Sequence, residues 1–139
     1  MSSLESLEGI KVLVIDDCAD TLASLHDLLE GMRATVTTAR SGPEALAHLK
    51  TFRPDVIVSD IGMPDCDGYQ LMRMVRVRGA EEGGATAAIA LTGHATNGDH
   101  TRALLAGFSA HIAKPFAPKV LCAAIQRLAR AHGRSCSLG

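Results

Sequence analysis

The stretch KVLVID at residues 11–16 is a short run of apolar residues that ends in an acid, and two similar runs follow it. Residues 55–60 read DVIVSD and residues 87–92 read AAIALT. Continuous apolar runs of this length are typical of strands that are buried on both faces, as in a parallel sheet covered by helices. Residues 35–39 (TVTTA) and 111–114 (HIAK) are predicted to be two further strands.

Segments with the spacing of amphipathic helices separate these runs. In residues 19–30, for example, leucines recur at helical intervals until Gly31 ends the pattern. The other predicted helices cover residues 43–50, 68–78, 97–106 and 118–131. Strands that alternate with helices form right-handed βαβ units. The sequence therefore predicts an α/β fold of the (βα)5 type, a doubly wound parallel five-stranded sheet.

Length and composition limit the domain organisation. The chain has 139 residues, of which 47% are hydrophobic, so one domain with a substantial core is expected. We expect this domain to span residues 10–131, with an N-terminal tail or linker at residues 1–9 and a C-terminal tail at residues 132–139.

Charge and cysteine usage exclude several classes of protein. The chain carries 14 Lys+Arg and 15 Asp+Glu, so the composition gives no support for direct binding to nucleic acid. No apolar run approaches the roughly 18 residues of a membrane span, and the first residues lack the features of a signal peptide. The four cysteines are spaced too irregularly for a zinc site or a disulfide framework. These features predict a cytoplasmic protein without direct membrane contact.

Polar residues follow the predicted strands where each strand ends. Asp16 and Asp17 end the first strand, Asp60 ends the third, Thr92 ends the fourth and Lys114 ends the fifth. In an open parallel sheet, ligands bind beyond the carboxyl ends of the strands. We therefore expect three carboxylates, a hydroxyl and an ammonium group to meet at one edge.

This combination predicts phosphoryl chemistry. Crowded carboxylates require a neutralising cation or raised pKa values, and hard oxygen ligands suit Mg²⁺. Lys114 and the metal would neutralise a transferring phosphoryl group, to which Thr92 could donate a hydrogen bond. Asp60 is then the predicted nucleophile, which forms an aspartyl phosphate.

Four motifs in this order carry a family resemblance: DD at 16–17, DIGMPDCDG at 60–68, LTG at 91–93 and AKPF at 113–116. Together they resemble the receiver domain of two-component response regulators over about residues 10–130. The resemblance implies a flavodoxin-like receiver fold and a phosphorelay function. It also implies that a phosphohistidine supplies the phosphoryl group that Asp60 accepts.

The resemblance also implies a metal site. Asp17 matches the direct Mg²⁺ ligand of the family, and Asp16 matches the companion acid that holds metal-bound water. Asp60 and the backbone carbonyl of Gly62 match the remaining protein ligands of the metal.

A conformational switch is implied as well. Thr92 matches the hydroxyl that moves toward the phosphoryl group, and Lys114 matches the lysine that contacts it. His111 stands where the family usually has Tyr or Phe, so this switch residue could titrate near neutral pH. Pro115 matches a proline that usually follows a cis peptide bond in the family. The resemblance implies that the face of the fourth helix, fifth strand and fifth helix changes on phosphorylation and could pair two copies.

The expected partner is a sensor histidine kinase or a histidine phosphotransfer protein. The GF-x-AH-x-x-KP pattern that ends at Pro115 is similar to receivers fused to hybrid sensor kinases, which favours that origin. A stand-alone single-domain response regulator is the alternative, and a phosphorylation-independent docking module is a more remote one. A phosphatase of the haloacid-dehalogenase type is disfavoured, because its general acid would be an Asp where this chain has Gly62. For Cys18, beside the acids, we expect a raised thiol pKa.

Overall fold

Five parallel strands form one sheet. The structure is a computed structural model that describes residues 6–61, 68–77, 86–92, 101, 104–114 and 117–138, with the backbone alone for residues 68, 69 and 131–138. The strands are β1 (Lys11–Ile15), β2 (Thr35–Ala39), β3 (Val56–Asp60), β4 (Ala87–Thr92) and β5 (Ala110–Ala113). Their order in the sheet is β2-β1-β3-β4-β5, and every pairing is parallel.

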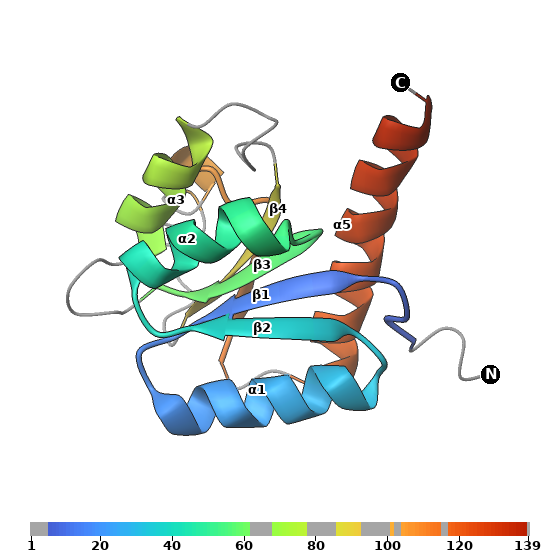
Figure 1. Cartoon of the computed structure of the whole chain (residues 1–139), viewed down its shortest axis with the longest axis horizontal. Coiled ribbons are helices and arrows are strands. Elements are labelled where there is room, and N and C mark those ends of the chain that lie inside the picture. Colours follow the sequence, from blue (N-terminus) through green and yellow to red (C-terminus); the bar gives the residue numbers. More distant parts are fainter. Residues whose placement is uncertain are drawn as a thin grey trace.

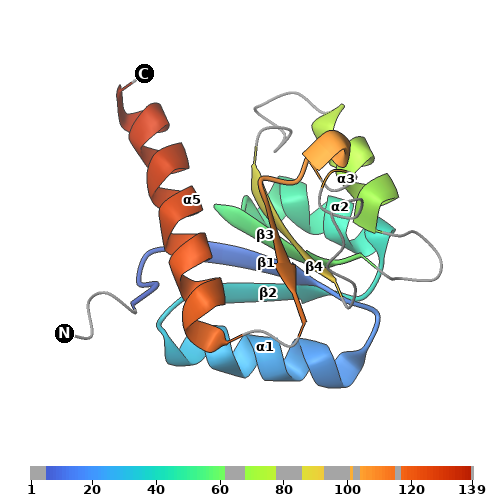
Figure 2. The same ribbon diagram turned by 180° about the vertical axis from the view of Figure 1, so that it is seen from behind.

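Helices cover both faces of this sheet (Figures 1 and 2). They are α1 (Ala19–Gly31), α2 (Gly42–Phe52), α3 (Gly68–Arg76) and α5 (Pro118–Leu138). Helices α1 and α5 lie on one face, and α2 and α3 lie on the other. The predicted doubly wound α/β fold is therefore confirmed. The predicted helix 97–106 lies outside the described residues except at 101 and 104–106, which are helical.

The alternation of side chains along each strand divides the core into two layers. Leu13 and Ile15 of β1 pack in the cluster under α2 and α3. Val12 and Val14 pack in the cluster under α1 and α5. Because successive side chains of a strand point to opposite faces, an uninterrupted apolar run is what a sheet covered on both sides requires.

Local sequence signals set the ends of α2. The Ser41 side chain accepts a hydrogen bond from the Glu44 N–H (3.2 Å), and the Glu44 carboxylate accepts one from the Arg40 N–H (2.9 Å). The first bond satisfies a backbone donor of the first helical turn, and the second satisfies the N–H of the residue before the N-cap. Arg53 follows the helix with a φ of 53°, in the left-handed conformation that commonly ends helices.

Ser6 and Leu7 contact the folded body, although residues 1–9 were predicted to be a tail. Leu7 is fully buried, and its N–H donates to the Met32 carbonyl at 2.6 Å. The Gln126 side-chain amide of α5 donates to the Ser6 carbonyl at 2.8 Å. Leu7 therefore belongs to the same core cluster as the buried residues of α1 and α5.

Helix α5 also differs from its prediction, because it continues to Leu138 rather than ending at residue 131. Gly133 is the only helix breaker in this stretch, and one glycine inside a helix costs only about 1 kcal/mol. Figures 1 and 2 show that the C-terminal half of α5 extends past the edge of the sheet. In the parts of the chain that the structure describes, no helix is both long and apolar enough to cross a bilayer.

Candidate functional site

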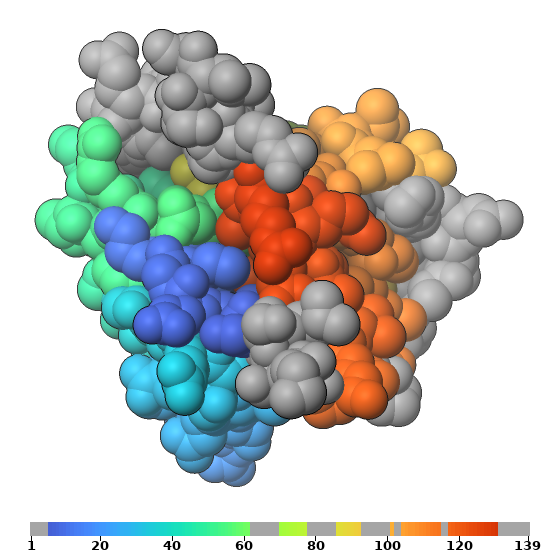
Figure 3. Space-filling model, turned by 90° about the vertical axis from the view of Figure 1, so that its right-hand side faces the viewer, coloured from blue at the N-terminus to red at the C-terminus, as the bar shows by residue number. Residues whose placement is uncertain are grey.

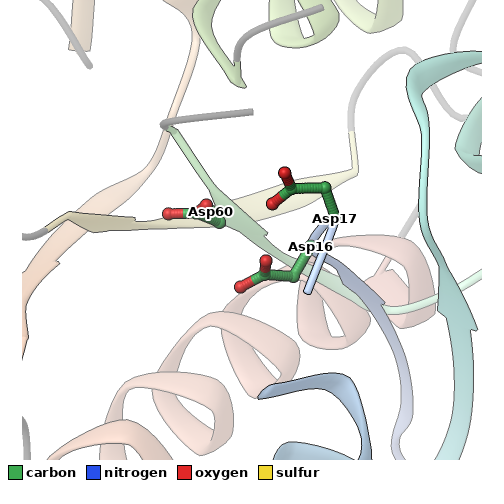
Figure 4. A group of neighbouring side chains, drawn as sticks. All are labelled: Asp16, Asp17 and Asp60. Carbon is green, nitrogen blue, oxygen red and sulfur yellow. The ribbon is translucent and has the colours of Figure 1, made fainter. Parts of the chain in front are cut away.

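Three carboxylates meet at the carboxyl ends of β1 and β3 (Figure 4). Ile15 and Ser59 are partners in the parallel register, so Asp16 and Asp60, which follow them, lie level with each other. One oxygen of each of Asp16, Asp17 and Asp60 lies within 4.8 Å of the others. The predicted convergence of these acids is therefore confirmed.

The three acids differ in their environments. Asp16 is 2% exposed, Asp60 is partly buried and Asp17 is exposed. The Asp16 carboxylate accepts a hydrogen bond from the Cys18 N–H at 2.9 Å, which is an Asx-turn at the start of α1. The sequence analysis missed this contact, although an Asp two residues before the N-cap of a helix is a signal for it.

Lys114 connects the acids to β5. Its Nζ donates to an Asp60 oxygen at 3.2 Å and lies 3.9 Å from Asp16 Oδ2. Its backbone N–H donates to the Thr92 carbonyl at 2.7 Å, which fixes the lysine at the end of β4. Among the described residues, Lys114 is the only cation that pairs with these acids. The site therefore has an excess of negative charge.

The Asp16 carboxyl shows the effect of that excess. Burial, above all, raises the pKa of Asp16, and the charge of Asp60 raises it further. The hydrogen bond from the Cys18 amide and the charge of Lys114 oppose this rise. A divalent cation held by hard carboxylate oxygens would remove the repulsion, so the donor set fits Mg²⁺.

Thr92 and His111 share one face of the sheet. Thr92 ends β4 and is 7% exposed. His111 pairs with Ala90 in the β4–β5 register, and its Nε2 atom is buried. Partners in a parallel register point to the same face, as do residues two apart on one strand. The two predicted switch residues are therefore neighbours. Gly62 and Pro115 lie outside the described residues.

The prediction for Cys18 was wrong. The thiol is exposed at the N-cap of α1, and its pKa is lowered rather than raised. The hydrogen-bond donors near the thiol, which are the Thr21 hydroxyl and the N–H groups of residues 20 and 21, favour the thiolate and lower its pKa, whereas the charge of Asp20 has only a small opposing effect. Donors at the start of a helix stabilise a thiolate more than the nearby acids destabilise it.

An open groove of about 440 Å³ leads from the site along α1. Lys114 and Leu91 line one part of it, and the other lining residues come from α1: Asp20, Thr21, Ser24, Leu25 and Leu28. The groove is mostly apolar. Lys114 belongs both to the groove and to the acidic site, so the two are continuous.

Comparison with known proteins agrees with this geometry. The family model for the response regulator receiver domain matches residues 12–126. An uncharacterized 14.6 kDa protein in the sodA1 3′ region of Leptolyngbya boryana is 38% identical over 124 residues, which cover 89% of this chain and 93% of that protein. The histidine-protein kinase BarA of Escherichia coli is 34% identical over 111 residues, 80% of this chain.

These relatives differ in length. The chain spans about half of the transcriptional regulatory protein PrrA of Mycobacterium leprae (35% identity over 88% of this chain, 51% of PrrA). It spans only 12% of BarA. The matched region is therefore one part of longer regulators and kinases and nearly the whole of the Leptolyngbya protein.

Solved structures share the fold. The chemotaxis protein CheY4 of Vibrio cholerae aligns with a TM-score of 0.79 and 30% identity, covering 86% of this chain and 98% of CheY4. The receiver domain of the sensor histidine kinase PA1611 of Pseudomonas aeruginosa aligns with a TM-score of 0.78 and 30% identity over 87% of this chain and 98% of that domain. That receiver has a magnesium ion coordinated in its active site cleft.

Proposed function

The chain belongs to the response regulator receiver domains of two-component signalling, and we propose that Asp60 is its phosphoryl acceptor. One observation carries this assignment: among the described residues, only Asp60 combines a position at a central strand end with a 3.2 Å contact to the Lys114 ammonium and two neighbouring acids. An acceptor carboxylate needs a nearby cation, because negative charge accumulates there as the phosphoryl group arrives.

The chemistry that we propose is a transfer from a phosphohistidine. An Asp60 oxygen attacks phosphorus, the P–O bond forms and the P–N bond breaks, and the histidine leaves as neutral imidazole once its nitrogen carries a proton. Lys114 lies close enough to neutralise an oxygen of the transferring group. Thr92 would donate a hydrogen bond from its hydroxyl group to another oxygen. Hydrolysis of the acyl phosphate at the same site would return Asp60 to its starting state.

A magnesium site is part of this proposal. Asp16, Asp17 and Asp60, with the backbone carbonyl of Gly62, would hold Mg²⁺. The compact oxygen cluster of the acids and the ion in the PA1611 receiver support this assignment. Bound there, Mg²⁺ supplies positive charge that stabilises the transferring phosphoryl group. Asp16 would contribute through its fixed orientation, since the Cys18 N–H already holds one of its oxygens.

Phosphorylation is proposed to act through β4 and β5. Thr92 would move toward the phosphoryl oxygens, and His111, its neighbour on the same face, would occupy the vacated space. The cis bond before Pro115 stays a prediction. The output would be a population shift of the face built by β5, α5 and the segment between β4 and β5, a face that could also pair two copies.

The proposed donor is a sensor histidine kinase or a histidine phosphotransfer protein. The groove along α1 supports this, because it reaches Lys114 and can take a helix that presents a histidine. We propose residues 10–131 as the receiver unit, which contains the region matched by the family. Hybrid-kinase origin stays a prediction, because relatives of both architectures match the chain.

The test compares the wild type with Asp60→Asn and a matched control, Asp27→Asn, at an exposed position of α1. Each protein is incubated with Mg²⁺ and phosphoramidate, a donor with a P–N bond, and intact mass is recorded. We expect one added phosphate on the wild type and on the control, and none on Asp60→Asn. Equal labelling of Asp60→Asn would refute the assignment. If the wild type is not labelled, and if beryllofluoride with Mg²⁺ also leaves its amide NMR chemical shifts unchanged, the docking-module alternative is favoured.

A further inference from the structure

Charge is divided unevenly along this chain. All of the Asp and Glu residues lie in residues 1–99, whereas six of the 14 Lys+Arg lie in residues 100–139. Helix α5 therefore carries basic side chains and no acidic one. A net charge of −1 conceals this separation.

The exposed cations of α5 lie on one side of the helix. We define the α5 basic stripe as Lys119, Arg127 and Arg130, all of which are exposed. At 3.6 residues per turn they fall within about 80° of one another, and Ala123 lies exposed between them. The opposite side of α5 packs in the core through Leu121 and its neighbours. Figure 3 shows α5 (red) across the middle of one face of the molecule.

The described part of the chain supplies no acid that neutralises the α5 basic stripe. None of its three cations forms an ion pair with any residue in the described segments. Arg127 and Arg130 are three residues apart, a spacing at which like charges repel on a helix surface. A helix optimised only for its own stability would place an acid one turn away. The arrangement indicates a partner that supplies the opposite charge.

Helix α1 carries the complementary pattern. We define the α1 acidic stripe as Asp20, Asp27 and Glu30, which are all exposed. These acids also fall within about 80° of one another, and Ala23 lies exposed among them. The acids are 7 and 3 residues apart, and the cations of α5 are 8 and 3 residues apart. Each stripe has a small residue near its centre, which allows two helices to approach closely.

We propose that the α5 basic stripe of one copy binds the α1 acidic stripe of a second copy. Both helices cover the same face of the sheet, so a twofold arrangement places α1 of each copy against α5 of the other. The contact shares α5 with the face proposed to change on phosphorylation, but its other surface, α1, lies outside that face. The proposed contact does not require phosphorylation.

A second copy fits these observations better than other anionic partners. Duplex DNA would require a dense phosphate-binding surface, and the α1 acids on the same side of the sheet would repel it. A membrane surface would require a broad apolar face, whereas the only large apolar side chain described as exposed on α5 is Val120. The matched spacing of opposite charges on this same chain is the specific argument for self-association.

The test is sedimentation velocity of the full chain without a phosphoryl donor, over a concentration series, at about 0.05 M and about 0.5 M salt. We expect self-association that weakens strongly at the higher salt. Arg127→Glu/Arg130→Glu should weaken it by about tenfold or more, and Asp27→Lys/Glu30→Lys should do the same. Mixing these two variants should restore association, because both contacts of the mixed dimer again join opposite charges. That restoration also shows that both variants are folded.

Lys50→Glu/Arg73→Glu is the matched control, since it reverses two exposed cations on α2 and α3, which cover the other face of the sheet, and should leave association unchanged. Four results would overturn the proposal. The first two are a wild type that stays monomeric at all concentrations and a control whose self-association is weakened as much as that of the α5 variant. The other two are no restored association on mixing the α1 and α5 variants, and self-association that is weakened by the α5 substitutions but not by the α1 substitutions. If the wild type is monomeric and binds DNA, and Arg127→Glu/Arg130→Glu abolishes that binding, the α5 basic stripe is a nucleic-acid-binding surface instead.

Discussion

Replacing Asp16 by Asn should make the metal-free protein more stable. Asp16 is nearly buried, and its pKa is raised chiefly by that burial and further by Asp60. An amide of the same shape removes the charge, and its oxygen can still accept the Cys18 N–H. The substitution therefore relieves repulsion without creating a cavity.

The size of the effect follows from the distances. Two unit charges 4.8 Å apart repel by about 3 kcal/mol at an effective dielectric constant of about 20. The Lys114 ammonium, 3.9 Å from Asp16, attracts the Asp16 carboxylate by a similar energy before solvent screening. Because the Lys114 side chain is 33% exposed, water weakens this attraction. Removal of the charge also removes the cost of burying it. We therefore expect the free energy of unfolding of Asp16→Asn to exceed that of the wild type by about 1–2 kcal/mol, or about 3–8 °C in melting temperature.

Magnesium should reverse the order of stability of the wild type and Asp16→Asn. A ligand at about 100 times its Kd stabilises the folded state by about 2.7 kcal/mol, and the wild type should gain this amount. The Asn variant lacks a charged ligand and should gain far less. In thermal or urea unfolding with and without Mg²⁺, the variant is thus expected to be the more stable protein without the ion and the less stable protein with it.

The pH dependence gives a second readout. A carboxyl whose pKa is raised in the folded state favours folding when it is protonated, and this contribution is lost as pH rises through the folded pKa. The stability difference between the Asn variant and the wild type should therefore shrink as the solution is acidified. Asp27→Asn, at a side chain that is 86% exposed, is the control and should change little. An Asp16→Asn protein that is less stable than the wild type without Mg²⁺ would refute the reasoning.

Two predictions concern the fold that supports the site. Leu7→Ala should cost about 2–5 kcal/mol because Leu7 is fully buried, whereas Leu105→Ala at an 83% exposed position should cost little, and urea unfolding compares them. Gly107→Ala should destabilise by about 1–3 kcal/mol, because its φ is 116° and an added Cβ would lie 2.7 Å from Arg76 Cγ. Gly31→Ala meets no atom within 4 Å and should be neutral or slightly stabilising; equal losses at both glycines would contradict this account.

Much of the fold could be predicted because it depends on local patterns. The apolar runs of β1, β3 and β4 are buried on both faces and therefore need no partner to be recognised. Helix ends were less predictable. Helix α5 runs through Gly133, because one unfavourable residue is outweighed by the helix around it. The inclusion of Leu7 in the core had no local signal, since a single leucine before a strand shows no periodicity.

The sequence by itself determined which chemical groups reach the site. In a parallel sheet the carboxyl ends of all strands lie at one edge, so the residues after each apolar run, among them Asp60 and Lys114, had to meet there. Tertiary structure alone decided how these groups act on one another. The burial of Asp16 beside an exposed Asp17, and the donors that lower the pKa of Cys18, depend on distances between segments and on access of water. Electrostatic effects vary with both quantities, and a linear pattern of residues contains neither.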